Sequence, residues 1–136
     1  MQIIWLTISA ILPLAAIAAA QTISPASPLA CDRSALTPAE RKRHFDELGP
    51  ALRGLVKKVR ELRNGYEFEL PADPATFRLA AEWAAVEHVC CPFFEIDLRQ
   101  EREKGAFWMR LAGRSGVKRF IEADFGGWMR RAGKGG

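Results

Sequence analysis

The sequence has few of the residues that mark a dedicated metal or redox site. Among 136 residues it has three cysteines, two histidines and one tyrosine. No two cysteines are separated by two other residues, which excludes the Cys-x-x-Cys spacing of structural zinc sites and of thiol–disulfide enzymes. The glycine-rich run at residues 113–118 lacks the spacing of a phosphate-binding loop. The sequence therefore contains neither of these motifs, and its three cysteines become the main candidates for a functional role.

Charge is not concentrated in a way that defines a partner. The net charge is +4 and the pI is near 9.3. The basic residues are scattered and are not interleaved with aromatic residues in a nucleic-acid-binding module, so no specific nucleic acid is expected as a partner. A hydrophobic content of 49% and a charged content of 26% are typical of one small globular domain.

Charged residues are also missing from the N-terminus. Residues 3–20 carry none, and the run ends in three alanines before Gln21. Small residues at such positions favour signal-peptidase cleavage, so we predict a signal peptide at 1–20 and a proline-containing linker at 21–30. The protein is then periplasmic or secreted. Two alternatives stay open, because no Lys or Arg precedes the apolar run: an uncleaved leader anchoring the protein in the membrane through residues 3–20, or a misassigned start codon and a cytoplasmic protein.

Turn and cap signals divide the remaining chain into helices and strands. Thr37, followed by Pro38 and Glu40, predicts a helix to about Leu48 that Gly49-Pro50 would end. Asn64-Gly65 predicts a hairpin turn with positive φ angles, joining an arm at 56–62 to a strand at 66–70. The first arm also fits a helical stripe, which leaves its structure open.

The second half of the chain repeats this order. Asp73-Pro74 predicts a helix to about Val89, which Pro92 prevents from continuing. Alternating apolar residues predict strands at 94–98 and 107–111 around a charged turn at 100–105. Ser115 is expected to cap a last helix that Gly126-Gly127 would end.

The order α-ββ-α-ββ-α predicts an α+β fold. The simplest arrangement is a two-layer one, an antiparallel sheet covered on one face by helices. The single domain would span 31–125, and 126–136 would be a basic flexible tail.

Soft and titratable side chains gather near the end of the second helix. Helical spacing places Glu87 beside Cys90 or Cys91. Two adjacent thiolates plus a third ligand can hold zinc, copper(I), mercury(II) or arsenite, and Cys31 or His44 can supply that ligand. A soft-metal site of Cys31, Cys90, Cys91, Glu87 and His44 is therefore one hypothesis. The pair lies at a helix C-terminus, where the helix dipole disfavours a thiolate, so no residue is assigned a catalytic role and a non-enzymatic function is favoured.

A structural role for the cysteines is the alternative. Exported proteins form disulfides, and Cys31 bonded to Cys90 or Cys91 would fasten the N-terminal segment to the core. The protein would then be a non-catalytic envelope domain that acts by binding a partner protein.

Several strings of residues, taken together, resemble a family of small bacterial proteins without an established activity. They are Cys31-Asp32, Glu40-Arg41 with Arg43-His44, Gly65-Tyr66, Gly116-Val117-Lys118 and, most specifically, Glu87-x-x-Cys90-Cys91-Pro92-Phe93-Phe94. The resemblance covers about residues 31–122. It implies that Cys31, His44, Glu87, Cys90 and Cys91 belong to the family pattern, which favours the hypothesis that they act together, and it supplies no reaction.

Overall fold

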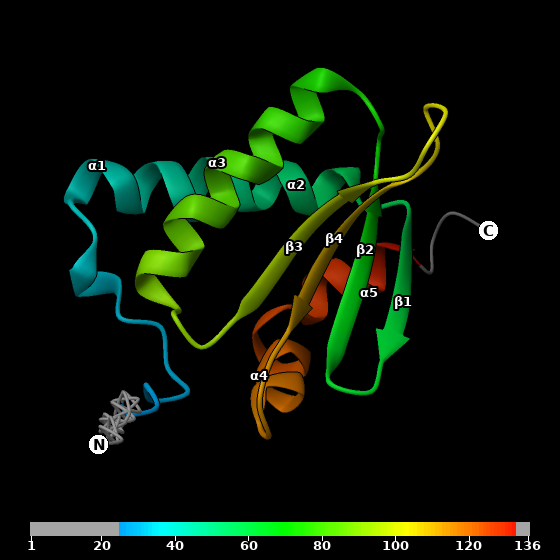
Figure 1. The fold of residues 1–136 in the computed structure, drawn as a ribbon. Coiled ribbons are helices and arrows are strands. Elements are labelled where there is room, and N and C mark those ends of the chain that lie inside the picture. Colours follow the sequence, from blue (N-terminus) through cyan, green and yellow to red (C-terminus); the bar gives the residue numbers. More distant parts are fainter. Residues whose placement is uncertain (1–24, 133–136) are drawn as a thin grey trace, which may run out of the picture.

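The computed structural model describes residues 25–132, so the predicted signal peptide at 1–20 and the last four residues of the predicted tail lie outside the described residues. The chain forms four strands and a series of helical segments (Figure 1). The helical segments are η1 (Arg33–Ala35), α1 (Pro38–Arg41), η2 (Lys42–Leu48), α2 (Gly49–Leu55), α3 (Pro74–Cys90), α4 (Val117–Asp124) and α5 (Gly126–Ala132). The strands are β1 (Lys58–Leu62), β2 (Gly65–Leu70), β3 (Glu95–Gln100) and β4 (Phe107–Ala112).

The four strands form one antiparallel sheet in the order β1-β2-β4-β3. The register places Val59, Phe68, Met109 and Leu98 in one row across the sheet, and this row faces the helices. The predicted two-layer α+β fold is confirmed. Figure 1 shows α3 running alongside β3, with α4 at the lower end of the sheet and α5 behind β2.

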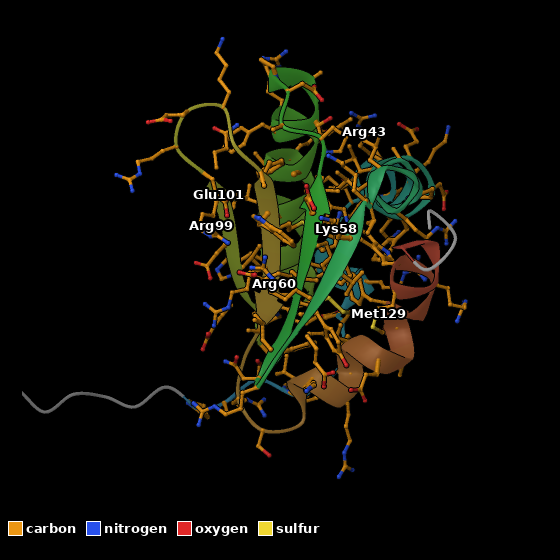
Figure 2. The ribbon with its side chains drawn as sticks, turned by 90° about the vertical axis from the view of Figure 1, so that its right-hand side faces the viewer. Arg43, Lys58, Arg60, Arg99, Glu101 and Met129 are labelled. Atoms are coloured by element: carbon orange, nitrogen blue, oxygen red, sulfur yellow. A yellow bond between two sulfur atoms is a disulfide. The ribbon has the colours of Figure 1, made fainter. Side chains whose placement is uncertain are left out.

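The other face of the sheet is polar. Figure 2 shows charged side chains of β1 and β3 on this side, including Arg60 and Arg99. Both arginines pair with Glu67 on β2, at N–O distances of 3.0 and 3.6 Å. Arg60 also lies over the ring of Trp108, 4.1 Å from its centroid. The core therefore lies wholly on the helical side.

The first predicted helix does not end where the sequence indicated. Gly49-Pro50 was expected to stop it, but η2 is a π-helical stretch that leads directly into α2. The Gly49 N–H reaches back to the carbonyl of His44, five residues earlier. Pro50 is the second residue of α2 and directly follows this wide turn. The widened turn thus carries the chain past the proline.

The hairpin prediction was right about the strands and wrong about the turn. Leu62 pairs with Gly65, so the turn residues are Arg63 and Asn64. Among the described residues only Glu103, Lys104 and Gly116 have positive φ. Gly65 is required for space, because a Cβ there would stand 2.0 Å from the Leu111 carbonyl oxygen on β4.

The C-terminal helices also differ from the prediction. Gly116, at φ 96°, occupies the N-cap of α4 in place of Ser115, and no side chain caps the helix. Gly126-Gly127 begins α5 rather than ending α4. Trp128 is buried against Phe68 and Trp83, so α5 brings this side chain into the core, where the sequence predicted the start of a flexible tail. Burial of the Trp128 ring therefore outweighs the glycine pair that suggested the end of the domain.

No helix within residues 25–132 has both the length and the apolar character needed to cross a bilayer.

The packing of the only tyrosine yields a pH prediction. Burial, together with the hydrogen bond that Tyr66 donates to Glu122 at 2.8 Å, raises the pKa of Tyr66 to about 12. In the unfolded chain this pKa is about 10. Between these values the native state keeps a proton that the unfolded state loses, so the free energy of unfolding falls as pH rises.

An ultraviolet phenolate titration should therefore show a midpoint near pH 12 in the native protein and a lower one in urea. Glu122→Gln should lower the native midpoint. A native midpoint equal to the one in urea would contradict this packing.

Candidate functional site

Three sulfur atoms meet where α3 ends. Cys31 and Cys91 form a disulfide across 60 residues of sequence, and Cys90 is a free thiol. The Cys90 Sγ lies 3.6 Å from the Cys91 Sγ. All three predicted cysteines therefore converge, and the bond that the sequence left open is formed by Cys91.

The local sequence explains why two adjacent cysteines serve different partners. Cys90 is the last residue of α3 and points into the core, whereas Cys91 leaves helical geometry at φ −127° and ψ 65° because Pro92 follows. The N-terminal segment runs beside this helix end, and the Asp32 N–H donates to the Cys90 carbonyl at 2.7 Å (Figure 1). That hydrogen bond brings Cys31 to Cys91.

A buried hydrogen bond lies beneath the sulfurs. His44 Nε2 and Glu87 Oε2 are 2.6 Å apart, and both side chains are almost fully buried. A carboxylate can only accept, so the imidazole N–H at Nε2 donates. The His44 ring stacks on Trp83 at 5.5 Å, which fixes its plane, and Nδ1 has no hydrogen-bond partner within the described residues.

Glu87 also controls the chemistry of Cys90. Its carboxylate Oε2 is 3.9 Å from the Cys90 Sγ, and its carbonyl oxygen is 3.7 Å away. Burial, followed by the negative charge of Glu87, raises the pKa of the Cys90 thiol to about 12. The thiol is therefore protonated at neutral pH, which disfavours a role as a nucleophile.

The five residues predicted to act together lie in one cluster. Potential ligand atoms of Cys31, Glu87 and Cys91 lie within 4.8 Å of one another, and so do those of His44, Glu87 and Cys90. Glu87 belongs to both groups and joins them. The donor set contains three sulfurs, a carboxylate and an imidazole, which matches soft or borderline metals.

A pocket of about 630 Å³ opens beside this cluster. Cys31, His44 and Glu87 line it, and aromatic walls come from Phe45, Trp83, Phe120, Phe125 and Trp128. Arg33 and Arg53 contribute two guanidinium groups and Asp124 one carboxylate. Cys90 and Cys91 do not line the pocket and are fully buried, so Cys31 is the one cysteine of the three that lines it.

Sequence reasoning missed the residues that shape this pocket. Trp83 precedes Glu87 by four residues, and this helical spacing could have placed both on one face. Arg53 gave no signal in the sequence. Trp128 was missed because Gly126-Gly127 was expected to end the domain before it. His88, three residues before Cys91, is exposed to solvent.

Comparison with known proteins gave no match to a family model, to a curated protein or to a solved structure. The case for function therefore stands on the site itself.

The disulfide yields a first prediction. A crosslink over 60 residues stabilises the fold by about 4 kcal/mol in the chain-entropy description. Cys31→Ser should lower the free energy of unfolding by about that amount, whereas Cys90→Ala should leave the bond intact. Denaturant unfolding and a thiol count measure both.

The unreduced, denatured protein should show one free thiol, and three after reduction. Three free thiols without reduction would contradict the disulfide.

The buried pair yields a second prediction. His44→Leu leaves the Glu87 carboxylate buried without its partner, which should cost about 3–5 kcal/mol. The double variant His44→Leu/Glu87→Leu removes both polar groups and should be more stable than His44→Leu alone. Denaturant melts of the wild-type protein, the single variants His44→Leu and Glu87→Leu and the double variant measure the coupling, and a double variant as unstable as the summed single variants would contradict it.

Proposed function

We propose that this protein binds a soft metal or metalloid ion through Cys31, Cys90 and Cys91 after the Cys31–Cys91 disulfide has been reduced. The observation that carries the proposal is the convergence of three sulfurs on one buried carboxylate. Glu87 would assist as a further oxygen ligand or as a nearby negative charge, and His44 would orient it.

The sulfur spacing supports this arrangement. Two thiolates on one zinc ion, each about 2.3 Å from it at a tetrahedral angle, lie about 3.8 Å apart. Cys90 Sγ and Cys91 Sγ are already 3.6 Å apart. Reduction of the disulfide with two electrons and two protons would free Cys31 and Cys91, and a third sulfur would then lie within reach of the same ion.

The ion itself follows from donor chemistry. Thiolates favour zinc, copper(I), mercury(II) and arsenite over hard cations. Three thiolates with few other donors suit trigonal coordination of the softer members of this group.

The proposal places the protein outside the cytoplasm, in the periplasm or secreted. The uncharged run at 3–20 supports export, and the disulfide is of a kind that oxidising compartments preserve. The mass of the mature chain tests this, since cleavage before Gln21 predicts a defined N-terminus.

Binding by the reduced protein is the central test. Protein reduced with a phosphine under anaerobic conditions should bind one mercury(II) ion or one arsenite per chain, followed by absorbance and mass spectrometry. The oxidised protein is the matched control, because it keeps one thiol of the three. Cys90→Ala should weaken binding by more than the roughly 10–100-fold that loss of an outer-shell partner costs.

Glu87 can be tested separately against a carboxylate on the same helix. Glu87→Gln should weaken binding by about 10–100-fold. Glu82→Gln alters an exposed carboxylate that pairs with Arg43 and should leave affinity unchanged. Equal affinity of the oxidised and reduced proteins would refute the proposal.

A second candidate is a non-catalytic envelope domain that binds a partner protein. The disulfide and the Asp32–Cys90 hydrogen bond favour it, because they fasten the N-terminal segment to the core. Reduced protein that unfolds and binds no metal would support this candidate instead.

A further inference from the structure

We propose that the pocket beside Cys31 receives a small organic thiol bearing a carboxylate, and that this thiol reduces the Cys31–Cys91 disulfide. The inference rests on the proposed function for its purpose, since reduction would free the metal-binding sulfurs. Its chemistry can be measured without any metal.

Access to sulfur sets the direction of attack. Cys90 and Cys91 are fully buried and lie outside the pocket lining, whereas Cys31 is half-buried and lines the pocket. A thiolate entering the pocket therefore approaches the disulfide from the side of Cys31, and attack on the Cys31 sulfur makes Cys91 the leaving sulfur.

The exchange balances in two steps. The thiolate RS⁻ bonds to Cys31 Sγ, the Cys31–Cys91 bond breaks, and Cys91 leaves as a thiolate that takes up the proton lost by RSH. A second RS⁻ attacks the R-bearing sulfur of the mixed disulfide, so R–S–S–R forms and Cys31 leaves and is protonated. Two thiols are oxidised to one disulfide, and the protein disulfide is reduced to two thiols.

Charge selects a carboxylate-bearing thiol. Arg33 and Arg53 both line the pocket, and within the described residues neither is found in an ion pair with a carboxylate. The Arg33 guanidinium is held 3.9 Å above the Phe45 ring. Two carboxylates, Glu87 and Asp124, also line the pocket. Glu87 already accepts a hydrogen bond from His44, so Asp124 is the one lining carboxylate left to oppose the positive charge of the arginines. The pocket is thus more attractive to anions, and the guanidinium groups also favour the thiolate form of an incoming thiol.

Size and shape indicate an organic molecule. About 630 Å³ exceeds what a bare ion needs and falls within the range of small-molecule sites. The aromatic walls suit an apolar body.

The test compares three small thiols on the full chain. Reduction of the disulfide by 3-mercaptopropionate, 2-mercaptoethanol and cysteamine is followed by mass spectrometry after alkylation, with rates expressed per thiolate. The same thiols acting on 2-hydroxyethyl disulfide give their intrinsic reactivities. After this correction, 3-mercaptopropionate should react about tenfold or more faster than cysteamine, and added salt should reduce the ratio.

Matched variants separate the pocket from the overall charge. Arg33→Gln/Arg53→Gln should bring the corrected ratio close to one. Arg102→Gln removes a positive charge from the exposed turn between β3 and β4 and should preserve it. On the unmodified protein, 3-phenylpropionate, which has a carboxylate and an aromatic ring but no thiol, should slow reduction in a saturable manner.

A wild-type ratio near one, or no effect of 3-phenylpropionate, would overturn the inference. A loss of selectivity in Arg102→Gln as large as in the pocket variants would do the same. Selective reduction followed by failure to bind mercury(II) or arsenite would instead sink the proposed metal function and leave this pocket chemistry in place.

Discussion

The hydrogen bond between His44 and Glu87 is the constraint on which the site depends. It joins the π-helical stretch η2 to the last turn of α3, two elements that are separated in the sequence by α2, β1 and β2. A carboxylate excluded from water needs a partner of this kind, and the partner must approach within 2.6 Å. The π-helical turn at 42–48 places His44 in the interior and also leads the chain into Gly49-Pro50. The irregular backbone therefore supports the buried pair.

The two adjacent cysteines lie in different surroundings. Burial, followed by the negative charge of the nearby Glu87, raises the pKa of the Cys90 thiol, whereas Cys91 leaves helical geometry one residue later. Two neighbouring cysteines therefore differ in state: Cys90 is a buried free thiol, and Cys91 forms the disulfide. The division arises from a helix end and a proline rather than from any difference in side-chain chemistry.

Sequence reasoning predicted the fold class, the strands β2, β3 and β4 and the helix α3, because these depend on local signals: alternating apolar residues, charged turns and the Asp73-Pro74 helix start. It left β1 open between a strand and a helix. It also predicted the five residues of the cluster, since Glu87, Cys90 and Cys91 are neighbours in sequence. It failed where a distant contact decides the local structure. Gly65 is a glycine because of Leu111, on a strand more than forty residues away, and Trp128 is ordered because Phe68 and Trp83 cover it. No local pattern carries that information.

The strand order has a consequence for how the chain can be divided. β4 lies between β2 and β3, so it supplies the hydrogen-bonding partner of both. A chain that stops before Phe107 has the β1–β2 hairpin and β3 but nothing to join them, and each would present an open edge to other molecules. The disulfide cannot substitute for β4, because both of its cysteines precede β3. Synthesis from the N-terminus therefore produces every ligand of the candidate site well before the sheet that supports it can close.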